Sequence, residues 1–121
     1  IVYNLVSNAI KYRNPEKELC VDITTTLQPD GAVVLRVKDN GLGINLGTQK
    51  ENIFKLYRRF HTHVDGKGLG LYLVKTQVDT LGGSIEVESE INKGTTFIIT
   101  LPHPKNVSKQ FFFESDAAQI Y

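Results

Sequence analysis

The chain has 121 residues, of which 22% are charged and 40% are hydrophobic, and its net charge is +1. This length predicts one domain, and the near-neutral charge gives no general reason to expect nucleic acid or an anionic membrane as a partner. A single cysteine, Cys20, excludes an internal disulfide and favours a reducing compartment, and no apolar run approaches the roughly 20 residues that span a bilayer.

The N-terminal residues predict an amphipathic helix that Pro15 closes. Its apolar stripe comprises Ile1, Val2, Leu5, Val6, Ala9 and Ile10. Asn4, Asn8 and Lys11 stack on another face, because positions i, i+4 and i+7 lie above one another. A solvated back face would account for them, and a binding face is the alternative. The chain begins inside this helical pattern, so we expect it to be part of a longer protein.

Two strands joined by a tight turn are predicted next. Residues 21–27 alternate apolar and polar side chains, which is typical of a half-buried strand, and the Pro-Asp-Gly sequence at 29–31 predicts the turn. Residues 33–37 alternate in the same way. Asp39 falls on the same parity as the apolar residues of this second strand. We therefore expect its carboxylate at the inward-facing end of a buried face.

A loop and two helices are predicted in the middle of the chain. Residues 40–50 are loop-like, and a short helix is expected over 52–60. Apolar residues recur with helical spacing over 71–81, and Gly82 and Gly83 end that helix.

Two further strands complete the predicted sheet, one around residues 85–87 and one around residues 97–101. Thr95 shares the inward parity of the last strand. The pattern then fades. We assign residues 1–102 to the domain and residues 103–121 to a C-terminal tail.

Two glycine-rich motifs are candidate binding segments. DNGLGI, at residues 39–44, directly follows a strand. A strand-ending turn would explain its glycines, but an inward-facing carboxylate beside them suits a flat ligand that carries an amino donor. DGKGLGLYLVK, at residues 65–75, runs into a helix, where backbone N–H groups and the helix dipole favour an anion. It lacks the Gly-Lys-Ser/Thr signature of a P-loop.

Five segments in the order NLVSNAIKY, DNGLGI, IFKLYRRF, GKGLGL and GTTF resemble the ATP-binding catalytic domain of bacterial sensor histidine kinases, within the GHKL superfamily. The resemblance covers residues 1 to about 102. It implies a Bergerat-type ATP-binding fold, which is a two-layer α/β sandwich of the α+β kind. Its sheet would be mixed but largely antiparallel, with helices on one face. The family's domain normally starts with a strand and a helix before the first segment, so we expect this chain to be N-terminally truncated.

The resemblance assigns the first segment to the metal and the phosphates. Asn8 would bind Mg²⁺ through its side-chain oxygen, with Asn4 close to the same site. Lys11 would reach the phosphates of ATP, and Tyr12 would lie near the nucleotide. Few protein oxygens are needed, because Mg²⁺ keeps several waters and also takes phosphate oxygens.

The same resemblance assigns the adenine pocket to two other segments. Asp39 would accept a hydrogen bond from the adenine amino group. Gly41, Gly43 and Ile44 would shape the pocket, and Thr95 would complete it.

The remaining segments would form the phosphate contact and the lid. Arg59 is the better candidate for a phosphate contact, and Arg58 is the second. Gly66, Gly68 and Gly70 would form the lid hinge and the phosphate cradle. The other residues assigned to this part of the site are Lys67, Leu69 and Leu71, of which the leucines would pack below.

The resemblance also implies a function and partners. The chain would bind Mg-ATP and donate the γ-phosphoryl group to a histidine on a separate helical dimerisation and phosphoacceptor domain, with a response regulator downstream. Asn8, Lys11 and Arg59 would supply positioning and charge neutralisation. The isolated chain would be inactive without its acceptor domain. The full-length protein would be a homodimer, cytoplasmic or with this part on the cytoplasmic side of a membrane anchor, and no nucleic acid is expected.

Hydrolysing members of the superfamily, such as type II topoisomerases and heat-shock chaperones, place a glutamate four residues before the metal asparagine to activate water. Here that position is Asn4, whose amide cannot act as a base. The sequence therefore favours a transferase over a hydrolase. A non-catalytic nucleotide-binding module and an anti-sigma-type serine kinase of the same superfamily are the alternatives.

Overall fold

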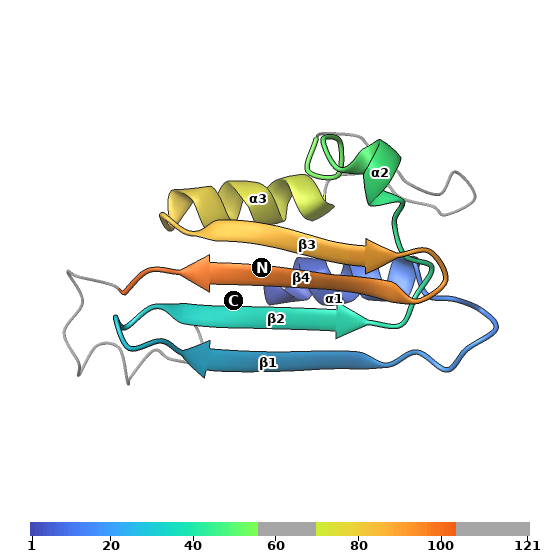
Figure 1. Cartoon of the computed structure of the whole chain (residues 1–121), viewed down its shortest axis with the longest axis horizontal. Coiled ribbons are helices and arrows are strands. Elements are labelled where there is room, and N and C mark those ends of the chain that lie inside the picture. Colours follow the sequence, from blue (N-terminus) through green and yellow to red (C-terminus); the bar gives the residue numbers. More distant parts are fainter. Residues whose placement is uncertain (56–69, 104–121) are drawn as a thin grey trace.

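The computed structural model describes residues 1–55 and 70–103, which form a sheet layer and a helix layer (Figure 1). The four antiparallel strands have the spatial order β1-β2-β4-β3 and are β1 (Val21–Leu27), β2 (Val33–Asp39), β3 (Ser84–Glu90) and β4 (Gly94–Leu101). The helices are α1 (Val2–Lys11), α2 (Leu46–Gln49) and α3 (Gly70–Thr80). This confirms the expected two-layer fold. All pairings among the described strands are antiparallel, so these strands contain no parallel pair of the expected mixed sheet.

The core lies where α1 and α3 pack together over β2 and β4. Its buried residues are Ile1, Leu5, Leu35, Val37, Leu71, Val74, Val78, Phe97 and Ile99. The helical members recur at spacings of three and four and the strand members at a spacing of two, as the predicted periods require. Burial of each large side chain stabilises the fold by about 1.5–3 kcal/mol. With this apolar stripe turned inward, α1 keeps its asparagines off the core.

The prediction that β1 is half-buried is wrong. Six of its seven residues are exposed, including Ile23 at 46% and Leu27 at 73% relative exposure. The strand lies at the edge of the described sheet, whereas α1 contacts β2 and α3 contacts β3. Alternation correctly predicted a strand, but the helices that would bury its apolar side do not reach this edge.

The loop that follows β2 also differs from its prediction. Residues 40–50 were expected to be irregular, yet α2 forms at Leu46–Gln49, because the Asn45 side chain accepts the Gly47 N–H at 3.0 Å and so caps it. Turns, and not the expected helix, follow over 51–54, and residues 56–60 lie outside the described part. Ile53 is buried, and the Phe54 ring packs edge-on against Phe97 with centroids 6.4 Å apart.

The predicted turns are confirmed. In the β1–β2 turn, the Gly31 N–H donates to the Gln28 carbonyl at 2.9 Å. The end of α3 is closed by Gly82, at φ +76°, and by the Gly83 N–H, which donates to the Val78 carbonyl at 2.9 Å.

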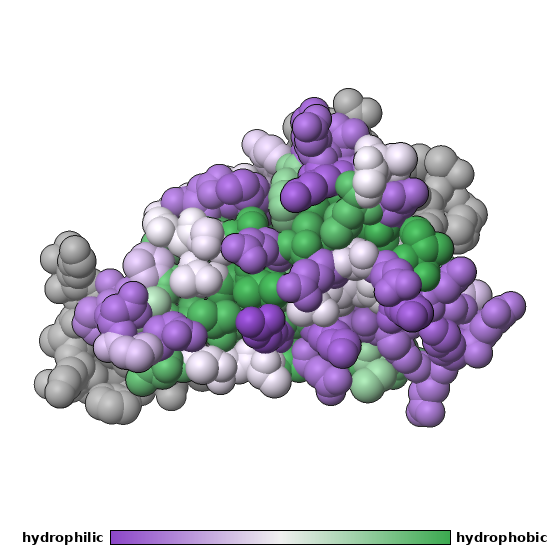
Figure 2. Space-filling model, viewed as in Figure 1, coloured by the Kyte–Doolittle hydropathy of each residue, from purple (hydrophilic) through white to green (hydrophobic). Residues whose placement is uncertain are grey.

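The sheet face away from α1 is viewed in Figure 1, and hydrophilic side chains cover much of it (Figure 2). Its exposed residues include Asp22, Thr24, Thr26, Arg36, Lys38, Glu86 and Glu88. No described helix is long and apolar enough to cross a membrane.

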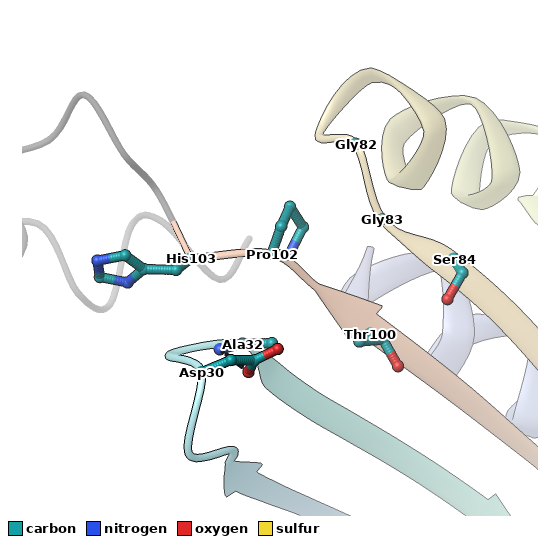
Figure 3. A pocket seen from close by; sticks show the side chains of 8 residues that line it. All are labelled: Asp30, Ala32, Gly82, Gly83, Ser84, Thr100, Pro102 and His103. Carbon is teal, nitrogen blue, oxygen red and sulfur yellow. Dashed lines mark hydrogen bonds between the residues drawn. The ribbon is translucent and has the colours of Figure 1, made fainter.

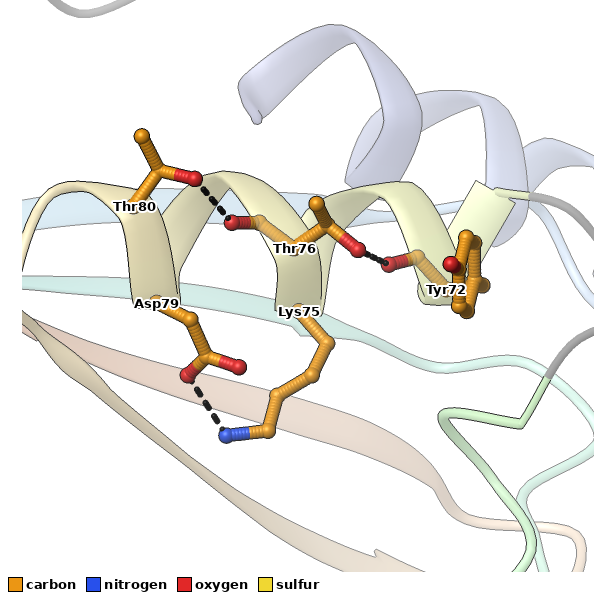
Figure 4. A network of polar contacts seen from close by, with 5 residues as sticks. All are labelled: Tyr72, Lys75, Thr76, Asp79 and Thr80. Atoms are coloured by element: carbon orange, nitrogen blue, oxygen red, sulfur yellow. Dashed lines mark hydrogen bonds and ion pairs between the residues drawn. The ribbon is translucent and has the colours of Figure 1, made fainter.

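The outward face of α3 is polar as well (Figure 4). Lys75 and Asp79 form an ion pair at 2.8 Å, and the hydroxyls of Thr76 and Thr80 each donate to the carbonyl four residues earlier at 2.9 Å. An exposed i, i+4 pair contributes only about 0.2–0.5 kcal/mol. This face therefore has the character of a solvated surface, and the candidate site lies elsewhere.

Candidate functional site

A single polar row interrupts the helix-covered face of the sheet at one end. The β3–β4 register pairs Ser89 with Thr95, and extending the β2–β4 register by one residue places Asp39 opposite Thr95. The adjacent row is Val37, Phe97 and Val87. Three polar side chains from neighbouring strands thus meet at the edge of an apolar core. The sequence parity of Asp39 and Thr95 predicted their placement, and the structure confirms it.

The Asp39 carboxylate is held by backbone donors and keeps one oxygen available. Its Oδ1 accepts the Gly41 N–H at 2.9 Å and the Thr95 N–H at 3.2 Å. Within residues 1–55 and 70–103, no donor pairs with Oδ2, and no fully buried side-chain oxygen lacks a partner. Oδ2 is therefore not fully buried, and it is the oxygen of this carboxylate without a donor among these residues.

Burial raises the pKa of Asp39 above its usual value, although the hydrogen bonds from Gly41 and Thr95 act in the opposite direction. Desolvation disfavours the charged form of a carboxyl. A donor from a ligand would offset that cost, because a hydrogen bond to a charged acceptor is stronger than one between neutral groups.

The glycine-rich loop after β2 is held against the end of α1. The Leu42 N–H donates to the Tyr12 carbonyl at 2.9 Å. A Cβ at Gly41 would lie 2.5 Å from that same carbonyl oxygen, so only glycine permits this approach. Tyr12 is the C-terminal cap of α1, and its backbone N–H donates to the Asn8 carbonyl at 3.0 Å. The loop that follows Asp39 is thereby held against the C-terminal end of α1, the helix that carries Asn4, Asn8 and Lys11.

Glycine is also required where β4 begins. Gly94 has φ +121°, and a Cβ there would collide with the backbone carbonyl of Asp39. The end of β2 and the start of β4 therefore lie in direct backbone contact, which positions Thr95 to donate to Asp39. Gly43 is buried against the backbone of Glu90, and Ile44 is buried beside it.

Ser89 is a member of the polar row that the sequence analysis did not identify. Its Oγ accepts the Ile44 N–H at 2.7 Å, donates to the Gly94 carbonyl at 2.9 Å and lies 2.8 Å from Thr95 Oγ1. The signal was present in the sequence. Ile85, Val87 and Ser89 alternate inward, just as the residues leading to Asp39 do.

The amide face of α1 carries polar side chains that have no partner among the described residues. Asn4 and Asn8 are half-buried and Lys11 is exposed. None of these three side chains forms a hydrogen bond or an ion pair within the described ranges. The same ranges contain no cluster of three or more His, Cys, Asp or Glu residues. A cation here would accordingly take one or two amide oxygens and complete its shell with water or phosphate, as Mg²⁺ does.

The remaining predicted site residues divide into two groups. Gly70 begins α3, and Leu71 is buried in the core. Arg58, Arg59, Gly66, Lys67, Gly68 and Leu69 lie outside the described residues. The placement of the phosphate contact and of most of the lid therefore stays a prediction.

A pocket of about 390 Å³ lies at the other end of the sheet (Figure 3). Its lining residues are Asp30, Ala32, Gly82, Gly83, Ser84, Thr100, Pro102 and His103. Asp30 Oδ1 already accepts the Ala32 N–H at 3.0 Å, and the His103 side chain lies against Gly31. None of the predicted site residues lines this pocket. The polar row is the better candidate because it contains two of the predicted site residues, Asp39 and Thr95.

Comparison with known proteins gives the family. The family of histidine kinase-, DNA gyrase B- and HSP90-like ATPases matches residues 1–105. Sensor protein RprX of Bacteroides fragilis is 42% identical over 113 residues, which cover 88% of this chain and 21% of RprX. Sensor protein SrrB of Staphylococcus aureus is 37% identical over 113 residues, which cover 87% of this chain and 18% of SrrB. The chain thus spans about a fifth of the length of these curated relatives.

Solved structures show the same likeness. The mycobacterial sensor histidine kinase MprB superposes with a TM-score of 0.70 at 30% identity, over 84% of this chain and 66% of that one. Full-length ShkA in complex with AMPPNP superposes with a TM-score of 0.68 at 29% identity, over 84% of this chain and 20% of that one. With the family matched from residue 1 to residue 105, the chain belongs to the histidine kinase-, DNA gyrase B- and HSP90-like ATPases.

Proposed function

We propose that this chain binds Mg-ATP and transfers its γ-phosphoryl group to a histidine on a separate helical phosphoacceptor domain. The observation that carries the proposal is the open acceptor of Asp39 at the end of the core, joined to the amide face of α1 through the contact between Leu42 and Tyr12. This arrangement offers a nucleobase subsite and a phosphate subsite on adjoining elements. The sensor histidine kinases among the structural neighbours support the choice of reaction.

The base subsite favours adenine for a chemical reason. Asp39 Oδ2 can only accept when the carboxyl is ionised, and the amino group of adenine carries the donor that it lacks. A purine with a carbonyl at that position would place an acceptor against an acceptor. The AMPPNP bound in the ShkA complex is an adenine nucleotide, which agrees with this preference.

The phosphate subsite would be formed mainly by α1. Asn8 would hold Mg²⁺ with Asn4 one turn away, and Lys11 at the end of the helix would face the phosphates. When bound, Mg²⁺ neutralises charge on the phosphate oxygens. We further assign Arg59, with Arg58 as the second candidate, to a phosphate contact. Gly66, Gly68 and Gly70 are assigned to the lid hinge and the phosphate cradle.

Transfer to a histidine is preferred over hydrolysis because α1 carries no base. The helix contains no carboxylate, and Asn4 stands where hydrolysing relatives of the superfamily place their glutamate. In the proposed reaction, an imidazole nitrogen of the acceptor attacks the γ-phosphorus, the bond to the bridging oxygen breaks, and ADP leaves. The chain's own residues orient the nucleotide and balance its charge, which is the main requirement of phosphoryl transfer.

The chain would act as one part of a larger protein. Residues 1–102 would be the catalytic unit and residues 103–121 a tail, in line with the family match over residues 1–105. The acceptor domain would precede it in a homodimer, and a response regulator would receive the phosphoryl group.

The reaction is tested by incubating the chain with γ-labelled ATP, with and without a helical phosphoacceptor domain of a related sensor kinase. We expect slow phosphate release from the chain alone and acid-labile phosphoprotein on the added domain, because the site lacks a base and needs an external nucleophile. An acceptor domain whose histidine is replaced by alanine is the control. Brisk hydrolysis by the chain alone would overturn the argument from Asn4. Binding without any transfer would favour a non-catalytic module, and acid-stable phosphoserine would favour the serine kinase.

Asp39→Asn should have different effects on ATP binding and on the stability of the fold. It should weaken ATP binding by about 1.5–3 kcal/mol, the range for a hydrogen bond to a charged group. The raised pKa means that the folded state binds this proton more tightly than the unfolded state does. The resulting stabilisation is present at low pH and is lost as pH rises through the raised pKa. Because asparagine imitates the neutral form, the free energy of unfolding at neutral pH should stay equal or rise.

Calorimetry with ATP and thermal unfolding of the same samples measure both quantities. Asp22→Asn, at an exposed aspartate on the neighbouring strand, is the control and should change neither. Unaltered ATP affinity in Asp39→Asn would remove Asp39 from the site.

Asn8→Ala tests the metal assignment. It should abolish most of the magnesium-dependent part of ATP affinity and leave adenosine binding intact, because adenosine has no phosphate to share the ion. Titrations with and without Mg²⁺ measure this difference. Gln77→Ala, which removes an exposed amide from α3, is the matched control. If magnesium dependence persists in Asn8→Ala, the ligand is another residue, and Asn4 should be tested next.

A further inference from the structure

The Ser89 hydroxyl is shared by three partners from two segments. It contacts the Ile44 N–H at 2.7 Å, the Gly94 carbonyl at 2.9 Å and Thr95 Oγ1 at 2.8 Å. Gly94 and Thr95 are buried and Ser89 is half-buried. In the polar row, Thr95 lies between Ser89 on β3 and Asp39 on β2. A hydroxyl has one hydrogen to donate and two lone pairs that accept, so these three contacts occupy all of its capacity.

Proton counting fixes the direction of each bond. The Ile44 N–H can only donate, and it fills one lone pair of Ser89. The Gly94 carbonyl can only accept, so it takes the single Ser89 hydrogen. The remaining contact therefore has Thr95 as its donor and Ser89 as its acceptor.

This arrangement commits the Thr95 hydroxyl hydrogen to Ser89. Only the lone pairs of Thr95 Oγ1 remain for a ligand. Asp39 also offers only an acceptor, through Oδ2, and its Oδ1 is tied to the Thr95 backbone at 3.2 Å. Both side chains at the base end of the site are thus acceptors, and one of them is an acceptor only because Ser89 takes its hydrogen.

We propose that Ser89 is a positioning residue for nucleobase specificity, which acts by fixing the Thr95 hydroxyl as an acceptor and so excludes 6-oxopurines. This inference rests on the proposed binding of ATP. Without Ser89, the Thr95 hydroxyl would be able to rotate and donate to a carbonyl. A 6-oxopurine would then find a donor in a subsite that otherwise repels it.

The test compares ATP with ITP, because the two nucleotides differ at the base only by replacement of the 6-amino group with a carbonyl and the associated proton on N1. Calorimetry gives both dissociation constants for the wild-type chain and for Ser89→Ala. In Ser89→Ala, ATP should bind more weakly while ITP is spared. The preference for ATP should shrink by about three- to tenfold, which corresponds to one ordinary hydrogen bond.

Ser84→Ala is the matched control, since it makes the same change in the same strand at an exposed residue outside the polar row. Its preference for ATP should equal that of the wild-type chain. A double-mutant cycle with Thr95→Val tests the route of the effect. In the Thr95→Val background, Ser89→Ala should alter the preference by less than about twofold, because the hydroxyl on which it acts is gone.

A purely structural role would weaken ATP and ITP equally and leave their ratio unchanged, and that result would overturn the proposal. Because Ser89→Ala removes the partner of the Ile44 N–H, a second variant guards against loss of folding. Ser89→Cys places a weakly hydrogen-bonding thiol at the same position and should shrink the ratio in the same direction. A wild-type chain that binds no ATP would instead refute the proposed function. An unchanged ratio in a variant that folds and binds ATP refutes only the role of Ser89.

Discussion

The site depends on one shared acceptor, Asp39 Oδ1, which binds the backbone N–H groups of Gly41 and Thr95. These two bonds fix the turn after β2 and the start of β4 against each other, and the glycine at position 94 makes that contact sterically possible. They leave Oδ2 as the carboxylate oxygen without a donor among the described residues. The geometry of the proposed nucleobase subsite thus follows from how two strands of the sheet end.

The half-buried position of the Asp39 carboxylate does not favour the stability of the fold. The pKa of Asp39 is raised by burial, so its charged form is disfavoured relative to water. The surrounding core, including the fully buried Phe97 and Val37 in the next row, provides the compensating stabilisation. Proteins commonly lose some stability at a site that function requires. Ser89 also joins two segments, because its hydroxyl binds the Ile44 N–H of the loop and the Gly94 carbonyl of β4. The same hydroxyl contacts the Thr95 hydroxyl.

The position of the polar row could be predicted from the sequence. In a β-strand, side chains alternate between the two faces of the sheet, so the sequence position of a residue fixes the face that it occupies. Asp39 and Thr95 were placed correctly in this way, and Ser89 could have been found by the same alternation. The exposure of β1 could not be predicted, since it depends on which strand lies at the sheet edge and where the helices pack. The helix at Leu46–Gln49 was missed because its Asn45 cap stands among glycines that favour a loop. The link between Leu42 and Tyr12 is a long-range backbone contact, which side-chain patterns do not encode.

Amide NMR of the chain titrated with adenosine tests whether a nucleobase binds at the polar row. Adenosine lacks phosphates, so it isolates the base subsite from the metal and the lid. The largest shifts should occur at the Gly41 and Thr95 amides, because both donate to Asp39 and respond when its other oxygen gains a donor. Shifts centred instead on Ala32 and Gly83, in the pocket at the opposite end of the sheet, would contradict it.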